Sequence, residues 1–294
     1  MANKIIGLGE VLFDVLPEGA KLGGAPANFA YHIGQFGFDA MAVSAVGNDA
    51  LGARALRQFD DVGLKYIIPD VDYPTGTVNV SLNEAGVPTY EFTPDVAWDH
   101  IPFTPAVEEA ARSARAVCFG SLAQRSEESR NTIRRFLETA PKDCLKIFDV
   151  NLRGNFYNKE VLADGISHAD ILKINDEEIV TVGRMFNYSG LDMEEKCRVI
   201  MRRYPLKLVI LTCGTNGSYV FLPDGKTSFK PTPKVQVADT VGAGDSFTAA
   251  FTAAILSGKT IDEAHSLAVD VSAFVCTKKG AMPKLPEQLV ERLK

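Results

Sequence analysis

The sequence has few residues of the kinds that form disulfide frameworks or transition-metal sites. Its five cysteines include no Cys-x-x-Cys pair, and its four histidines show no His-x-x-x-His spacing. Zinc sites and redox motifs use such spacings. We therefore expect free thiols in a reducing compartment and no transition-metal centre.

The chain also lacks long apolar runs and clusters of basic residues. No segment reaches the roughly 18 uninterrupted apolar residues of a membrane span, and Glu10 and Asp14 interrupt the first apolar run, unlike a signal peptide. The net charge is −6 at pH 7, and the Lys and Arg residues are scattered. We expect a cytoplasmic protein with neither a nucleic-acid nor a membrane partner.

What the 294 residues do contain is a regular alternation of strand-like and helix-like segments, with no linker or internal repeat. This alternation predicts one α/β domain, residues 1–294, with a mostly parallel sheet. The predicted strands are 4–14, 42–47, 116–120, 145–151, 170–174, 207–211, 219–222 and 234–238. The predicted helices are 26–36, 49–61, 127–139, 246–256, 262–277 and 286–292.

One segment departs from this alternation. Residues 77–82 and 87–92 form a predicted hairpin around a turn at 83–86, with apolar and polar side chains alternating along its first strand. Pro88 indicates an edge strand. We interpret the hairpin as a small appendage, either a lid over a site or a surface for a partner subunit.

The most informative stretch is Gly242-Ala243-Gly244-Asp245, which opens the apolar helix predicted over 246–256. Free N–H groups and the helix dipole make such a corner attractive to anions. Asp245 would repel a resting anion, a conflict that disappears if its carboxylate faces a hydroxyl that loses a proton as it attacks phosphorus. The alternative is a left-handed glycine turn followed by an acidic helix cap.

Polar residues also follow several predicted strands, where open parallel sheets bind ligands. Asp14 ends the first strand. Asp149, Asn151 and Arg153 alternate near the end of the strand 145–151, so we expect them to share one face and reach one ligand.

Three further motifs have a structural and a functional interpretation. Gly23-Gly24, followed by Asn28, either admits a ligand close to the backbone or simply begins a helix. Asn175 and Glu178 have capping-box spacing. The turn at 212–217 could be a plain hairpin.

Taken together, these motifs resemble the ribokinase-like (PfkB) carbohydrate kinases, fructokinases in particular, over nearly the whole chain. The resemblance implies a three-layer α/β sandwich with a small β-sheet lid formed by about 12–22 and 73–98. Lids of this family frequently mediate dimerisation, so a homodimer through the lid is a further expectation. The matching motifs are GGAPAN at 23–28, DVNLR at 149–153, NxxE at 175–178, TxGxxG at 212–217, DTVGAGD at 239–245 and CTKKGAMP at 276–283.

The resemblance implies a role for each matching residue in phosphoryl transfer from ATP. Asp245 would be the general base, and the N–H groups of Gly242, Ala243 and Gly244 would stabilise the transferring phosphoryl group. The residues implied for the sugar are Asp14, Gly23, Gly24, Asn28, Arg153 and Asp245. Those implied for the nucleotide are Asn175, Glu178, Thr212, Gly214, Gly217, Gly242, Gly244 and Lys279.

The resemblance also implies two kinds of metal ion. Asn175 and Glu178 would organise Mg²⁺ through its waters, since magnesium keeps much of its hydration shell. Asp239 and the Val241 carbonyl match the position at which the family often binds a monovalent cation such as K⁺. One departure concerns the nucleotide: Val269 stands where many fructokinases have Asn, which puts one adenine-side hydrogen bond in doubt.

The activity implied is phosphorylation of D-fructose to fructose 6-phosphate. Another sugar or sugar acid, such as ribose, 2-keto-3-deoxygluconate or a nucleoside, is the alternative within the same chemistry. A non-catalytic, sugar-binding regulatory relative would have no need for Asp245. A nicotinamide oxidoreductase is disfavoured because Gly7-Leu8-Gly9-Glu10 lacks the third glycine of Gly-x-Gly-x-x-Gly.

Overall fold

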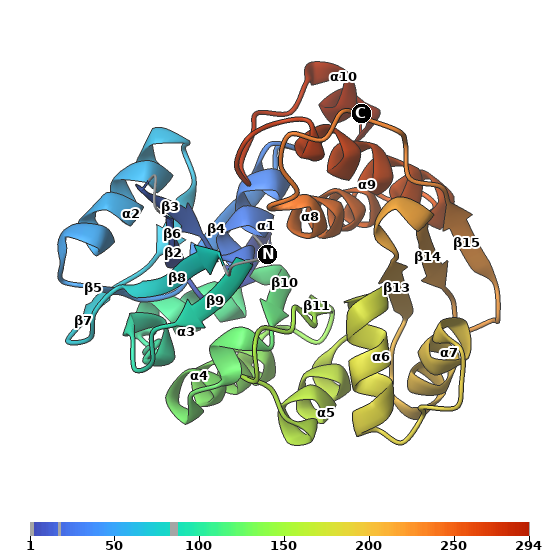
Figure 1. Ribbon diagram of the computed structural model, residues 1–294, viewed down its shortest axis with the longest axis horizontal. Coiled ribbons are helices and arrows are strands. Elements are labelled where there is room, and N and C mark those ends of the chain that lie inside the picture. The colour runs from blue at the N-terminus through green and yellow to red at the C-terminus, as the bar shows by residue number, and fades with distance from the viewer. Residues whose placement is uncertain (1–2, 17–18, 83–87, 294) are drawn as a thin grey trace.

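The computed structural model describes residues 3–16, 19–82 and 88–293, and its main element is a nine-stranded sheet (Figure 1). All neighbouring strands in it run parallel except at β14, which is antiparallel to both of its neighbours. In order across the sheet, the strands are β15 (Thr227–Lys230), β14 (Ser218–Phe221), β13 (Leu208–Thr212), β12 (Ile171–Asn175), β11 (Leu145–Asp149), β10 (Ala114–Gly120), β1 (Lys4–Leu8), β4 (Asp39–Val43) and β6 (Lys65–Ile67).

Helices cover both faces because consecutive strand residues point to opposite sides of a sheet. Ile5 and Ile147 pack into one core with the first helical layer, whereas Ile6 and Phe148 pack into the other. The first layer is α1 (Ala25–Gly34), α8 (Ala243–Leu256) and α9 (Ile261–Cys276), with α10 (Glu287–Val290) against it. The second is α3 (Pro105–Arg112), α4 (Glu127–Thr139), α5 (Lys159–His168), α6 (Asp176–Met185) and α7 (Met193–Arg203). The predicted three-layer α/β fold is confirmed.

A small separate sheet lies on the left side of the molecule in Figure 1, where β4 and β6 of the large sheet are also labelled. Its strands, in order, are β3 (Gly19–Gly23), β2 (Leu12–Leu16), β8 (Gly76–Leu82) and β9 (Pro88–Phe92). The hairpin strands form as predicted, and β9 is an edge strand, as Pro88 indicated. The turn predicted at 83–86 lies outside the described residues. Helix α2 (Ala50–Asp61) and the short pair β5 (Val46–Gly47) and β7 (Asp70–Val71) complete this side.

Three predicted strands are wrong in detail. The strand predicted at 4–14 is two strands. The chain leaves the large sheet after Leu8 and then enters the small sheet as β2, which carries Asp14. The strand predicted at 42–47 divides between β4 and β5. Residues 234–238 form no strand, and Val237 in this segment is 58% exposed. Within the described ranges, no helix is long and apolar enough to cross a bilayer.

Candidate active site

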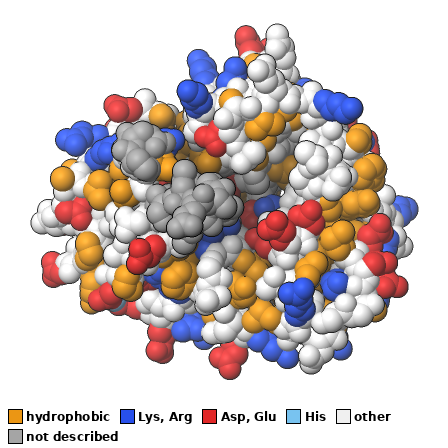
Figure 2. All heavy atoms as spheres, in the orientation of Figure 1, with side chains coloured by type: hydrophobic (Ala, Val, Ile, Leu, Met, Phe, Trp, Pro, Cys, Tyr) orange, Lys and Arg blue, Asp and Glu red, His pale blue; other side chains and the backbone are white. Residues whose placement is uncertain are grey.

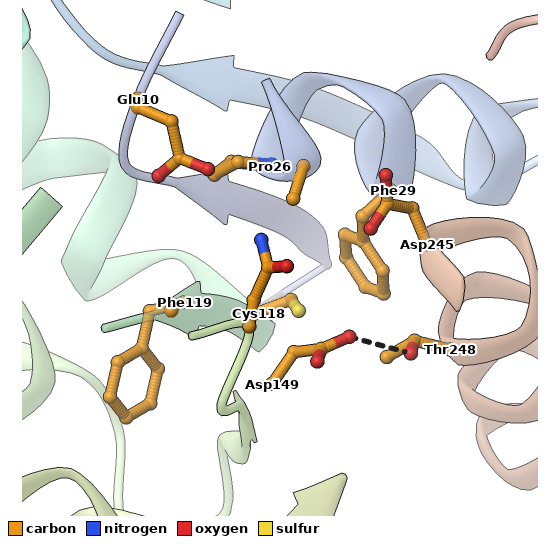
Figure 3. Close-up of a pocket in the computed structure, with 11 residues that line it drawn as sticks. Glu10, Pro26, Phe29, Cys118, Phe119, Asp149, Asp245 and Thr248 are labelled. Atoms are coloured by element: carbon orange, nitrogen blue, oxygen red, sulfur yellow. Dashed lines mark hydrogen bonds between the residues drawn. The ribbon is translucent and has the colours of Figure 1, made fainter. Parts of the chain in front are cut away.

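The carboxyl ends of the parallel strands meet the first turn of α8 at a narrow pocket. Because β1, β10 and β11 run parallel, residues at or just beyond their ends reach the same edge of the sheet. Figure 2 shows a hollow near the centre of the visible face of the molecule, with acidic side chains beside it. The pocket is lined by, among others, Glu10, Pro26, Asp149, Asn151, Asp245 and Thr248 (Figure 3).

The glycine corner that opens α8 has a backbone shape that other residues fit poorly. Gly242 caps the helix in the left-handed region (φ 77°), and a Cβ there would lie 2.8 Å from Ala281 Cα. The helix therefore begins three residues before the predicted start, which places Asp245 in its first turn. One of the N–H groups proposed to bind an anion, that of Ala243, donates to Thr240 O at 3.3 Å.

Asp245 is held by a direct contact with Asn28, a buried residue of α1. Asn28 Nδ2 donates to Asp245 Oδ2 at 2.8 Å, and Asn28 Oδ1 has no hydrogen-bond partner among the described residues. Burial, and after it the neighbouring Asp149 carboxylate, raise the pKa of Asp245 to about 6 against the opposing effects of Asn28, Lys173 and Arg153. The carboxyl group is therefore more basic than an ordinary aspartate.

A buried ion pair lies beneath the first turn of α8. Lys173 Nζ donates to Asp149 Oδ1 at 3.1 Å, and Thr248 Oγ1 of α8 donates to Asp149 Oδ2 at 3.1 Å (Figure 3). Burial by itself lowers the pKa of Lys173, but the carboxylates of Asp149, Glu178 and Asp245 raise it above the ordinary value. The lysine therefore remains a buried cation.

Three other residues predicted to hold the sugar come from the small sheet and from the start of α1. Asp14 is half-buried in β2, and a Cβ on Gly23 would lie 3.3 Å from Asp14 Oδ2. Gly24 has φ 128°, and a Cβ there would lie 2.4 Å from Glu10 O, so only glycine fits. Burial raises the pKa of Asp14, while Arg153 and Lys21 oppose the rise.

The expectation that Asp149, Asn151 and Arg153 share one face is wrong. Strand β11 ends at Asp149, and Asn151 has φ 43°, so the strand alternation does not continue to Arg153. Asp149 is buried in its ion pair, whereas Arg153 is exposed. Arg153 nevertheless lies near enough to Asp14, Glu10 and Asp245 to lower the pKa of each against the larger effect of burial.

Asn175 and Glu178 form the capping box that their spacing suggested. Glu178 N donates to Asn175 Oδ1 at 2.8 Å, and Asn175 N donates to Glu178 Oε2 at 2.9 Å. The second carboxylate oxygen accepts from Leu152 N at 2.9 Å. Because backbone N–H groups hold both oxygens of this buried carboxylate, the site fits a hydrated Mg²⁺ better than direct coordination.

The residues predicted for the nucleotide form a more open flank. Thr212 ends β13 opposite Asn175, its register partner. Gly214 is exposed and has φ 52°, while Gly217 has φ 97° and packs against Lys230 O, which a Cβ would approach to 2.6 Å. Lys279 is exposed in the loop after α9.

Asp239 connects two loops of this flank through hydrogen bonds. Its carboxylate accepts from Val241 N and from Gly280 N, each at 3.1 Å. Val241 itself is 50% exposed. Within the described ranges, no group of three or more His, Cys, Asp or Glu residues is placed to hold a metal ion.

Sequence reasoning missed Glu10, Lys173 and Thr248. Glu10 is 3% exposed, and its Oε2 atom has no hydrogen-bond partner among the described residues. Burial raises the pKa of Glu10 to about 7. A charged residue next to or within an apolar strand was the available signal for Glu10 and Lys173; Thr248 gave none.

The chain matches the model of the pfkB family of carbohydrate kinases over residues 19–288. It is 30% identical to an ATP-dependent 6-phosphofructokinase of Thermoanaerobacterium thermosaccharolyticum over 273 residues, which are 90% of this chain and 82% of that protein. It is also 30% identical to a fructokinase of Salmonella typhimurium over 308 residues, 98% of each chain.

A similar solved structure is the sugar kinase of Pyrococcus horikoshii in complex with ATP. It superposes with a TM-score of 0.82 at 26% identity, covering 99% of this chain and 100% of the other. The family match covers most of the chain, and the fold and sequence relatives agree with it. The chain therefore belongs to the pfkB family of carbohydrate kinases.

Proposed function

We propose that this kinase transfers the γ-phosphoryl group of ATP to the primary hydroxyl of D-fructose, giving fructose 6-phosphate. The observation that carries the proposal is the Asp245 carboxyl group, which lies in the first turn of α8 and accepts from Asn28 at 2.8 Å. A basic carboxylate beside a helix N-terminus suits a reaction in which a hydroxyl loses its proton as it attacks a phosphoryl group.

In this mechanism Asp245 Oδ1 or Oδ2 takes the proton of the attacking hydroxyl. Asn28 keeps the carboxylate in place and offers to a sugar hydroxyl its Oδ1 atom, which has no partner in the part of the chain that the structure describes. Asp14, from the small sheet, accepts hydrogen bonds from further hydroxyls, and Arg153, with the Gly23-Gly24 backbone, completes the sugar site. The sugar is thereby oriented for in-line attack.

The first turn of α8 stabilises charge on the transferring group. The N–H groups of Gly242, Ala243 and Gly244 point out of the helix start, where the dipole favours negative charge. The Ala243 N–H would exchange its 3.3 Å contact with Thr240 O for a phosphoryl oxygen. Donation by prearranged backbone groups costs little reorganisation as the reaction proceeds.

The open flank would hold the nucleotide and its ions. Mg²⁺, when bound, neutralises charge on the ATP phosphates, and Asn175 and Glu178 would orient its waters. Thr212, Gly214, Gly217 and Lys279 would line the nucleotide groove. Asp239 and the Val241 carbonyl are the proposed monovalent-cation position.

We further propose that residues 1–294 act as one domain whose small sheet closes as a lid and provides a homodimer interface. Support comes from β2, since this strand carries Asp14, and the charge of Arg153 acts on both Asp14 and Asp245. Closure would exclude water and prevent wasteful hydrolysis of ATP. We also propose a cytoplasmic location, which the need for ATP and the free thiols of the cysteines support.

The test is ADP release with Mg²⁺-ATP across fructose, ribose, glucose, 2-keto-3-deoxygluconate, adenosine and fructose 6-phosphate, with and without K⁺. We expect the highest kcat/KM for fructose. A higher value for another acceptor would keep the mechanism and replace the substrate. No turnover on any acceptor, with sugar binding still measurable by calorimetry, would replace the kinase by a sugar-binding regulator.

A further inference from the structure

The ion pair between Lys173 and Asp149 is buried, although neither residue has a role in the proposed proton transfer. Their side chains are 9% and 7% exposed, and the Lys173 Nζ to Asp149 Oδ1 distance is 3.1 Å. Burying two charges costs free energy because both lose their contact with water. Proteins in which apolar side chains replace such a pair are often as stable as the original. A role other than stability would explain a pair at this position.

Both members of the pair contact the helix that carries Asp245. Thr248 Oγ1 donates to Asp149 Oδ2 at 3.1 Å and lies 3.0 Å from Gly244 O. A Cβ on Gly244 would lie 3.0 Å from Lys173 Nζ, so the ammonium group lies against the first turn of α8. The pair therefore links the end of β11 and the middle of β12 to the turn that holds Asp245.

Charged and titratable groups from several other elements surround Asp245. Glu10 follows β1, Cys118 lies in β10, Asp149 ends β11, Arg153 lies in the next loop and Lys173 lies in β12. After burial, the Asp149 carboxylate is the largest influence that raises the pKa of Asp245, while Lys173 lowers it. The two partners of one ion pair thus act on Asp245 in opposite directions.

We propose that Lys173 and Asp149 are positioning residues whose paired charges hold the first turn of α8 and set the protonation of Asp245. Lys173 keeps Asp245 ionised near neutral pH, and Asp149 keeps that carboxylate basic enough to accept a proton. This inference rests on the proposed function, because it matters for catalysis only if Asp245 is the base.

The experiment is a titration of the Asp245 carboxyl carbon by NMR in the ligand-free protein, with ¹³C-labelled aspartate and the signal assigned from its loss in Asp245→Asn. In Lys173→Met we expect the midpoint to rise, and in Asp149→Asn to fall, each by on the order of one pH unit. In the double variant both effects are removed, so the midpoint should lie between those of the single variants. Thr248→Val removes no charge and should shift the midpoint of the Asp245 titration by no more than a few tenths of a pH unit.

The kinetic counterpart is the pH dependence of kcat/KM for the sugar, whose acid limb should move in the same direction as the NMR midpoint in each variant. If a single variant does not fold, the other single variant and the double variant still decide. An Asp245 midpoint that stays unchanged in the variants that fold, or moves the same way in both single variants, would overturn the proposal. Because the titration needs no substrate, an inactive wild-type protein would contradict the proposed function without affecting this result.

Discussion

The two flanks of the site differ in how firmly the protein holds them. On the sugar flank, by which we mean Asp245 and the residues around it, Asn28, Asp149 and Lys173 taken as whole residues are 3%, 5% and 7% exposed, and side-chain hydrogen bonds hold them in place. On the nucleotide flank, Val241 is 50% exposed, and Gly214 and Lys279 are exposed as well. Under the proposed function, the chain fixes its charges where a proton would move, and leaves open the side where a large ligand would enter and leave.

The largest effect should come from a substitution of Asp245 on the sugar flank. Asp245→Asn keeps the shape of the side chain but removes the base, so kcat should fall on the order of a hundredfold or more, with little change in sugar affinity. Steady-state kinetics and calorimetry with the sugar check both parts. Near-normal turnover would remove Asp245 from the mechanism.

A second prediction concerns Glu10, whose raised pKa should make stability depend on pH. Its folded-state pKa of about 7 lies above the ordinary 4.5, so the stability present below about pH 4.5 is lost as pH rises through 7. Glu10→Gln avoids that loss. We expect it to be more stable than the wild type by about 2–3 kcal/mol at pH 8, and by less than about 1 kcal/mol at pH 5.

Denaturant unfolding at the two pH values measures this difference. Glu138→Gln, at an exposed position of α4, is the matched control and should change stability little at either pH. Equal stability of Glu10→Gln and the wild type at pH 8 would show that Glu10 is not buried as a charged group.

The smallest predicted effect compares one glycine from each flank. Gly242 and Gly214 both have positive φ, of 77° and 52°, but only at Gly242 would a Cβ meet another residue, Ala281 at 2.8 Å. Gly214→Ala should therefore cost about 1 kcal/mol for backbone strain, and Gly242→Ala roughly 1–2 kcal/mol more for the clash. Thermal and denaturant unfolding of the two variants test the ranking, and equal losses would contradict the packing difference between the flanks.

Sequence patterns predicted the layers of this fold better than the details of its site. Alternating strands and helices, and the edge position of Pro88, depend on local patterns that the structure confirms. Asp14 was expected at the end of a strand of the large sheet, because Gly9 and Glu10 interrupt the apolar run without showing that the chain passes to a second sheet. The apolar residues at 234–238 suggested a strand, but local composition does not supply a partner strand.

The pair of Lys173 and Asp149 illustrates why the rest was not predictable. Twenty-four positions separate the two residues along the chain, and their contact depends on the register of β11 and β12. Thr248 joins them from 99 positions away, through the packing of α8. Motifs indicated Asp245 itself, whereas the groups that set its protonation come from other elements.

The pH dependence of kcat/KM for the sugar, at saturating Mg²⁺-ATP between pH 5 and 9, tests the central claim most directly. With Asp245 as the base and a pKa of about 6, kcat/KM should fall about tenfold per pH unit below a midpoint near 6. Asp245→Asn should lack this limb. A wild-type kcat/KM that stays constant from pH 8 to 5 would contradict a general base held in a buried, charged corner.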